Sequence, residues 1–297
     1  MAKGDKMLKY NYFPGCTLKT TGTDFEKSAL KVSPKLGFEL VELPRWHCCG
    51  TVAHLSSDNK MHSLGAIRTM IRVQETGDPK VVALCSICYN TLRRVNQRFN
   101  NDEQFNDAVV KFMDEEEEYR GEVETIHYLD IIRDIGFDKV KDAVIRPLAG
   151  LKVSPYYGCL LLRPSELSID PNYEEPTILE DLVESLGAEV ADNPYKIECC
   201  GAYETVHNPD MVAGMIYDII EGARRNGADT IVTSCPLCHF NLDSRQKILM
   251  KVKPDFEPMP ILYFTELMEL AMIEEKPSWE KHHIDPIPIV EKAFANK

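Results

Sequence analysis

A spacing pattern of cysteines that occurs twice constrains this chain more than any other feature. Each half has a lone cysteine, then an adjacent pair, then a CxxC motif. The separations are 31 and 35 residues in the first half and 39 and 34 in the second. The positions are Cys16, Cys48, Cys49, Cys85 and Cys88, then Cys159, Cys199, Cys200, Cys235 and Cys238. All ten cysteines of the chain belong to this pattern, which predicts an internal duplication.

The similarity of the two halves extends beyond the cysteines. In both 80–88 and 230–238 an apolar segment leads into the CxxC motif. A second pair of similar segments, 126–132 and 261–268, lies near the end of each half. The duplication therefore covers whole structural units and not the cysteine motifs alone.

The chain is long enough for two ordinary globular domains, with 297 residues and 44% apolar composition. We expect an N-terminal domain at 1–150 and a C-terminal domain at 151–297, each with its own hydrophobic core. The second ends in a tail, 276–293, which carries Trp279 and, after it, Pro286 and Pro288. This tail is a candidate docking segment for a partner, and the alternative is that it lies on its own domain.

Both halves alternate short β-rich runs with segments of helical periodicity. This pattern predicts an α/β fold with two repeated, Rossmann-like halves and mainly parallel sheets. Strands are expected at 8–13, 38–43, 81–84, 151–156, 188–191 and 230–233. Helices are expected at about 24–35, 61–76, 177–186 and 209–225, closed by Gly37, Gly77, Gly187 and Gly227. Every cysteine group then follows a strand, at the sheet edge where ligands of such folds gather.

Composition excludes several classes of function. A net charge of -13 disfavours nucleic-acid binding, which needs clustered cationic side chains. No segment approaches the roughly 20 apolar residues of a membrane span, and the N-terminus has no secretory h-region. We therefore expect a cytoplasmic protein with no membrane span. In that reducing compartment ten cysteines are more typical of metal binding than of disulfides.

Five cysteines per half exceed the four ligands of a structural zinc or a cubane cluster. Adjacent cysteines reach one tetrahedral ion only with strain, so the pairs favour a polynuclear iron-sulfur centre. Gly50 and Gly201 follow the pairs and would allow close backbone approach or a positive φ. The alternative is one buried, non-ligating cysteine per half beside a four-cysteine zinc or cubane site.

On this repeated motif, nearly the whole chain resembles the CCG-domain proteins, and in particular the family of heterodisulfide reductase B subunits. The resemblance implies that the five cysteines of each half hold one noncubane [4Fe-4S] cluster, two in all, facing each other across the substrate. It also implies a catalytic protein that reduces the mixed disulfide of coenzyme M and coenzyme B, or a related disulfide, by one-electron steps. The family members of methanogens have Cys-Cys-Pro where this chain has Cys48-Cys49-Gly50, so the disulfide itself stays open.

Electrons must come from a partner, because the chain has no dinucleotide fingerprint, Walker loop or cubane-ferredoxin motif. The resemblance implies a ferredoxin-like partner, the C subunit of such complexes, fed by their flavin-containing A subunit. A second hypothesis is a non-catalytic CCG-domain electron-transfer subunit of a succinate dehydrogenase-, glycolate oxidase- or lactate-utilisation-like complex. A third hypothesis makes one cysteine site a structural zinc.

Protons for the two product thiols require donors, and histidines near the cysteines are the candidates. His54 and His207 follow the two cysteine pairs, and His47 and His239 adjoin cysteines directly. Three cationic residues could attract an anionic substrate or, alternatively, serve surface solubility: Arg45, Arg163 and Lys196.

Overall fold

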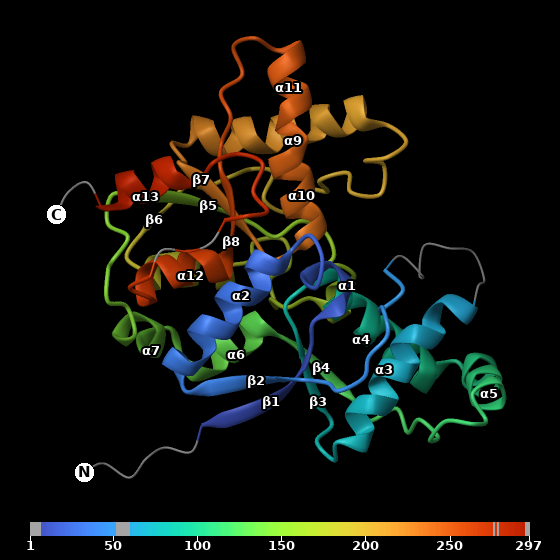
Figure 1. Cartoon of the computed structure of the whole chain (residues 1–297). Helices are drawn as coiled ribbons and strands as arrows, with labels where there is room; N and C mark the ends of the chain where they lie inside the picture. The colour runs from blue at the N-terminus through green and yellow to red at the C-terminus, as the bar shows by residue number, and fades with distance from the viewer. Residues whose placement is uncertain (1–6, 52–59, 276, 278, 295–297) are drawn as a thin grey trace, which may run out of the picture.

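The structure is a computed structural model that describes residues 7–51, 60–275, 277 and 279–294. Two four-stranded sheets, with every strand pair parallel, form its centre (Figure 1). The first sheet contains β1 (Leu8–Phe13), β2 (Phe38–Glu42), β3 (Lys80–Ala83) and β4 (Glu124–His127). The second contains β5 (Lys152–Tyr156), β6 (Glu189–Val190), β7 (Thr230–Thr233) and β8 (Ile261–Tyr263). Their orders, β2-β1-β3-β4 and β6-β5-β7-β8, are the same, which confirms a repeated α/β fold.

The strands agree closely with those expected from the sequence. β1 and β7 have the predicted bounds, and the other four predicted strands end within two residues of their predicted ends. β4 and β8 were not expected as strands. They lie in the two similar segments near the end of each half, where the short strand runs directly into a helix and the helical pattern masks it.

Helices cover the sheets in both halves. In the first half they are α1 (Gly15–Leu18), α2 (Thr23–Val32), α3 (Leu64–Glu75), α4 (Ser86–Asn101), α5 (Glu103–Phe112), α6 (Tyr128–Ile135) and α7 (Phe137–Asp142). In the second they are α8 (Ile178–Ser185), α9 (Pro209–Arg225), α10 (Pro236–Ser244), α11 (Gln246–Val252), α12 (Phe264–Met272) and α13 (Ile287–Phe294). The expected closing glycines have positive φ at Gly37, Gly77, Gly187 and Gly227.

The last strand of each half leads into its helix through the same capping box. In the first half the Asp130 carboxylate accepts a hydrogen bond from the backbone N–H of His127 at 2.9 Å. In the second half Glu266 accepts from the N–H of Tyr263 at 2.8 Å. Because a capping box satisfies donors that a helix start leaves free, both halves begin this helix at the matching residue.

The two halves pack together through helices that cross between them. In Figure 1, α2 of the first half lies along α12 of the second. The hydroxyls of Ser28 and Thr265 are 2.6 Å apart in this contact, and Phe25 stacks on Tyr263 with ring centroids 4.2 Å apart. The buried side chains of both halves thus join in one continuous cluster, and the expected division into domains at 1–150 and 151–297 stays a prediction.

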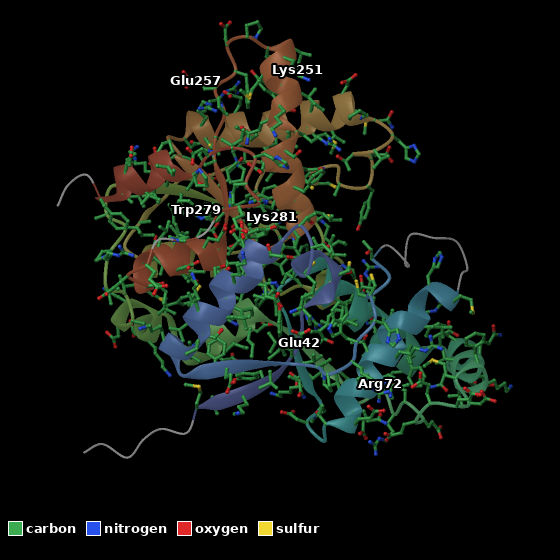
Figure 2. The ribbon with its side chains drawn as sticks, in the orientation of Figure 1. Glu42, Arg72, Lys251, Glu257, Trp279 and Lys281 are labelled. Carbon is green, nitrogen blue, oxygen red and sulfur yellow. The ribbon has the colours of Figure 1, made fainter. Side chains whose placement is uncertain are left out.

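The C-terminal tail lies on its own chain and touches both halves. The backbone N–H of Lys281 donates to Asp24 on α2 at 2.9 Å, and His283 and Ile284 donate to Asp243 on α10. Figure 2 labels Lys281 beside the start of α2. Lys276 and Ser278 are outside the described residues. Among the helices that the structure describes, none is long and apolar enough to cross a membrane.

Candidate iron-sulfur sites

The structure places the first five cysteines at the carboxyl ends of β1, β2 and β3. Cys16 lies in α1 directly after β1, and the pair Cys48 and Cys49 follows β2. Cys85 is the N-cap residue of α4, and Cys88 lies in the first turn of that helix. Three neighbouring strands thus deliver their cysteines to one edge of the sheet, as expected for a ligand site in a parallel sheet.

The second set has the same arrangement. Cys159 follows β5, the pair Cys199 and Cys200 follows β6, and Cys235 is the N-cap residue of α10 with Cys238 in its first turn. In both sets the lone cysteine and the first of the pair are the more exposed members, and the other three are buried. Each set therefore has one accessible side and one side closed by the fold.

Within each set the thiols converge. In the first set Cys16 Sγ is 3.7 Å from Cys48 Sγ, and the thiol of Cys88 hydrogen-bonds with those of Cys49 and Cys85. In the second set Cys200 Sγ is 3.4 Å from Cys238 Sγ. Cys159 hydrogen-bonds with Cys199, and Cys235 with Cys238. All ten cysteines are free thiols, so five sulfurs in each half are available to one centre.

A glycine before each lone cysteine makes room for this convergence. A Cβ added to Gly15 would lie 2.8 Å from Cys88 Sγ, and one added to Gly158 would lie 3.1 Å from Cys238 Sγ. Both glycines have positive φ, +71° and +66°, which disfavours any other residue there. These two glycines were missed from the sequence, although both precede the first cysteine of a set and that repetition was visible.

Hydrogen bonds favour one thiolate in each set. Hydrogen bonds from Cys48 and Cys88 lower the pKa of Cys49 below its ordinary value. In the second set a hydrogen bond from the Cys159 thiol lowers the pKa of Cys199 to about 6. The backbone N–H groups of Gly201 and Ala202 act in the same direction. The same hydrogen bonds raise the pKa of Cys88 and Cys159, so each set combines one thiolate, the form that binds metal, with protonated thiols.

The helix that carries each CxxC motif also holds the loop that carries the pair. On α4 the Thr91 hydroxyl donates to the Thr51 carbonyl at 2.9 Å. At the equivalent position on α10 the Asn241 amide donates to the Cys200 carbonyl at 2.9 Å. Gly50 and Gly201, in these loops, have φ of +85° and +73°, as the sequence indicated. The position of each pair is therefore coupled to its own CxxC helix.

The two cysteine sites lie next to each other. Ser86, between Cys85 and Cys88, has its hydroxyl 2.7 Å from that of Ser234, which precedes Cys235. The cavity at the second site is lined by Cys159, Cys199, Cys200, Cys235 and Cys238, by Tyr203, and by Ser86 and Ile87 of the first half. The carboxyl edges of the two sheets thus meet at the cysteine motifs.

The predicted histidine donors have different positions. His54 is outside the described residues, and His207 is exposed in the loop between Cys200 and α9. His47 is also exposed. His239 is buried, with its Nε2 3.1 Å from the Ile261 carbonyl oxygen. The structure therefore does not place His47 or His239 as an open donor at the cavity, and the roles of His54 and His207 remain predictions.

Two of the three candidate cations have carboxylate partners. Arg45 lies 3.4 Å from Glu75 and is exposed, and Lys196 Nζ lies 2.8 Å from Glu180. The guanidinium of Arg163 donates to the Ile197 carbonyl at 3.0 Å. These contacts correspond to the structural alternative, with Arg45 on the surface of the first half and Arg163 and Lys196 in the second half.

A half-buried tyrosine at the second site was not singled out from the sequence. Tyr203 lines the cysteine cavity, and its hydroxyl oxygen is buried with no hydrogen-bond partner among the described residues. Burial, together with the charges of surrounding cysteines, raises its pKa. No repeated counterpart is available to point to it, because the matching position in the first half, Val52, is outside the described residues.

Two repeated α/β units, each with five converging thiols at the carboxyl edge of its sheet, define a metal-binding protein of the iron-sulfur class. The CCG family, described as a cysteine-rich domain, matches residues 10–93 and 153–243. These two matches cover more than half of the chain, so the protein belongs to this family and contains two of its domains.

Curated relatives cover almost the full length of the chain. The 8-methylmenaquinol:fumarate reductase membrane anchor subunit of Wolinella succinogenes is 29% identical over 265 residues, covering 89% of this chain and 92% of the relative. The B subunit of the ferredoxin/F420H2-dependent CoB-CoM heterodisulfide reductase of Methanosarcina acetivorans is 29% identical over 271 residues, covering 90% of both. A protein of Archaeoglobus profundus, named as similar to the heterodisulfide reductase B subunit, is 28% identical and covers 90% of this chain and 91% of the relative. The family resemblance expected from the cysteine motif is confirmed.

Among solved structures, a hypothetical protein of Helicobacter pylori has a similar fold. The TM-score is 0.70 at 12% identity over 90% of this chain, and the match spans 49% of the other chain. At that identity the similarity concerns the fold alone. It shows that the arrangement of the two halves is one that another protein also adopts.

Proposed function

We propose that this chain is the catalytic iron-sulfur component of a multisubunit reductase that converts a disulfide to two thiols. In this proposal each five-cysteine set holds one noncubane [4Fe-4S] cluster. The observation that carries it is the convergence of five thiols, twice, at two sites joined by the contact of Ser86 with Ser234. Relatives named for the B subunit of heterodisulfide reductase support the class of substrate.

The reaction in this proposal is R–S–S–R′ + 2 e⁻ + 2 H⁺ → R–SH + R′–SH. Bound at the two sites, the clusters would each supply one of the two electrons, since iron-sulfur centres transfer electrons singly. The protein would position the two clusters and leave one side of each site open to a substrate. The accessible side is marked by the more exposed cysteines, which are Cys16 and Cys48 in one set and Cys159 and Cys199 in the other. A disulfide that reaches both sites can then be reduced without release of a half-reduced product.

The same proposal assigns protons and partners. His54 and His207 remain the proposed proton donors, of which His207 is exposed and free to exchange protons with water. Electrons come from a ferredoxin-like C subunit fed by a flavin-containing A subunit, with the complex in the cytoplasm. The tail at 276–293 is the proposed docking segment, on the surface it forms across both halves.

A second candidate is supported by the relative from Wolinella succinogenes, named as a component of a fumarate reductase. In that role the chain would pass electrons between partners and bind no disulfide. The thiol sites and their spacing would be the same in both roles, so geometry alone does not separate the two. A spectroscopic response of the clusters to a thiol or disulfide would distinguish the catalytic role from the electron-transfer role.

The experiment combines metal analysis and electron paramagnetic resonance of anaerobically purified protein. Two noncubane clusters predict about eight irons per chain and no sulfur-ligated zinc. A catalytic role also predicts that the oxidised protein shows a new paramagnetic signal when candidate thiols are added. Four irons with one zinc on cysteine sulfur would contradict the two-cluster proposal. Intact clusters with no response to any thiol would favour the electron-transfer role.

A further inference from the structure

Three side chains next to the second cysteine site converge without using any cysteine. They are His239 on α10, Glu266 in the first turn of α12, and His282 in the C-terminal tail. Each offers one nitrogen or oxygen atom, and these atoms all lie within 4.8 Å of one another. Two histidines and one carboxylate are a common ligand set for zinc and related metals.

The hydrogen bonds of the two histidines leave lone pairs for a metal. The Ile261 carbonyl can only accept, so His239 Nε2, 3.1 Å away, carries a proton and its Nδ1 does not. A backbone carbonyl that fixes the other ring nitrogen is typical of metal-binding histidines. His282 Nε2 lies 2.8 Å from Glu266 Oε1, and its Nδ1 is buried with no hydrogen-bond partner among the described residues.

Burial makes this site different from a surface ion pair. The side chains of Glu266 and His282 are each only 1% exposed. His239 is 5% exposed. Polar groups at this depth need partners to offset their desolvation. A metal held by His282 Nε2 and Glu266 would replace the hydrogen bond that now joins these two buried groups.

The charge around the three side chains also favours a cation. Asp24 and Asp243 are buried near His282, and one oxygen of Asp24 has no hydrogen-bond partner among the described residues. The cation that pairs with Asp24 is Lys27, at 3.7 Å and half exposed. Three buried carboxylates thus face His282 from α2, α10 and α12. A divalent ion would compensate this negative charge.

We propose that His239, Glu266 and His282 bind a divalent metal of the zinc class, at a site separate from the two cysteine sites. The Glu266 and His282 atoms, 2.8 Å apart, need to move by only about 0.5 Å to reach the separation of about 3.3 Å between neighbouring zinc ligands. Water can complete the coordination from the adjoining cavity of about 240 Å³, which His239, Asp243 and His282 line. The metal would connect the C-terminal tail to α10, the helix whose N-cap residue is Cys235.

This inference does not depend on the proposed disulfide substrate. The test uses the full chain with its clusters intact, purified anaerobically, incubated with excess Zn²⁺ and desalted. We expect about one zinc per chain in addition to unchanged iron. X-ray absorption at the zinc edge should show nitrogen and oxygen ligands at about 2.0–2.2 Å and not sulfur at about 2.3 Å. That readout separates this site from zinc misplaced on cysteines.

Two variants and a neighbouring control locate the ion. Glu266→Gln keeps an oxygen to cap the N–H of Tyr263 but loses the charge, and His282→Gln removes the imidazole. Each should lower zinc affinity at least about tenfold with iron content unchanged. The control is His283→Gln, because the His283 side chain contacts Lys247 and is not one of the three proposed ligands. This variant should bind zinc like the unmodified protein.

Three results would overturn the inference. They are a chain with full iron that takes up no zinc, zinc bound through sulfur alone, or undiminished zinc binding by His282→Gln. If Glu266→Gln fails to accumulate as a folded protein, His282→Gln decides the question, because His282 lies in the tail outside both sheets. In each case iron content reports whether the fold is intact.

Discussion

The hydroxyl oxygens of Ser86 and Ser234 lie 2.7 Å apart in the buried junction between the two cysteine sites. The backbone N–H of Ser86 also donates to the Ser234 carbonyl, at 3.4 Å. The two serines adjoin Cys85 and Cys235, the residues that cap α4 and α10. The starts of the two helices that carry the CxxC motifs are therefore in direct contact through these serines.

Removing one hydroxyl of this pair should destabilise the protein. Ser86→Ala leaves the buried Ser234 hydroxyl without its partner, at a cost of about 1–2 kcal/mol. We expect the midpoint of thermal unfolding to fall by about 2–8 °C at a fixed scan rate. In the double variant Ser86→Ala/Ser234→Ala the loss should be smaller than the sum of the single losses. Additive losses would mean that the two hydroxyls do not interact.

The second cysteine of each pair separates a five-thiolate site from a four-ligand site. If five thiolates hold each cluster, Cys49→Ala should remove the first centre and Cys200→Ala the second, because each thiol contacts its own set. Each variant should keep about half of the iron. Two-electron disulfide reduction should collapse in both, since one cluster supplies one electron.

Iron analysis and turnover with the cognate disulfide check this expectation. Each variant serves as the control for the other, because the spectroscopic signal of the untouched site should persist. Full iron with near-normal turnover in either variant would show that the cysteine is dispensable. The proposal of two facing five-thiolate clusters would then fail.

The glycines before the lone cysteines should tolerate no side chain. Gly15→Ala places a methyl 2.8 Å from Cys88 Sγ at a φ of +71°, so the thiols of the first set must move apart. We expect iron in the first site to fall several-fold, as judged by anaerobic iron analysis. Gly158→Ala should affect the second site less severely, because its contact is 3.1 Å.

Gly214, exposed on α9, is the matched control for these substitutions. A Cβ there meets nothing within 4 Å, so Gly214→Ala should leave iron content unchanged and add up to about 1 kcal/mol of stability. An equal loss of iron in Gly214→Ala and Gly15→Ala would contradict the steric explanation.

His127 predicts how stability changes with acid. It is fully buried, which lowers its pKa to about 3, while an unfolded histidine titrates near about 6.5. Between these values the unfolded state binds more protons, so the stability from His127 is complete above pH 6.5 and is lost as the pH falls toward 3. From pH 7 to pH 5 the free energy of unfolding should decrease by about 2 kcal/mol.

Anaerobic urea unfolding at the two pH values measures this decrease. The non-titrating variant His127→Asn provides the reference, because other groups contribute equally to both proteins. The unmodified protein should lose about 2 kcal/mol more than the variant. Equal losses would show that His127 is already protonated in the folded protein at pH 5.

Periodicity predicted most of the fold correctly, because both sheets are parallel and buried. The residues of β1 and β7 form short apolar or β-branched runs, and α9 runs between a proline start and a glycine end. β4 and β8 escaped prediction for the opposite reason. They are three or four residues long and continue without a break into α6 and α12.

The cysteine motifs likewise predicted the positions of the candidate sites, since cysteine spacing is a local property. The contact of Ser86 with Ser234 and the convergence of His239 with His282 depend on how distant segments pack. Nothing in the local sequence identifies them. The contact of α2 with α12 in the other half could not be predicted for the same reason.

The packing of α2 against α12 determines when, relative to translation, the first half of the chain can be completed. A ribosome that has completed α2 at Val32 must still make more than two hundred residues before α12, Phe264–Met272, emerges. During that time the apolar face of α2 is uncovered, and the first five thiols are held by an incomplete structure. Iron and sulfide delivery should therefore follow translation of the whole chain. A chaperone or scaffold that inserts the clusters would act on the finished polypeptide rather than on its first half.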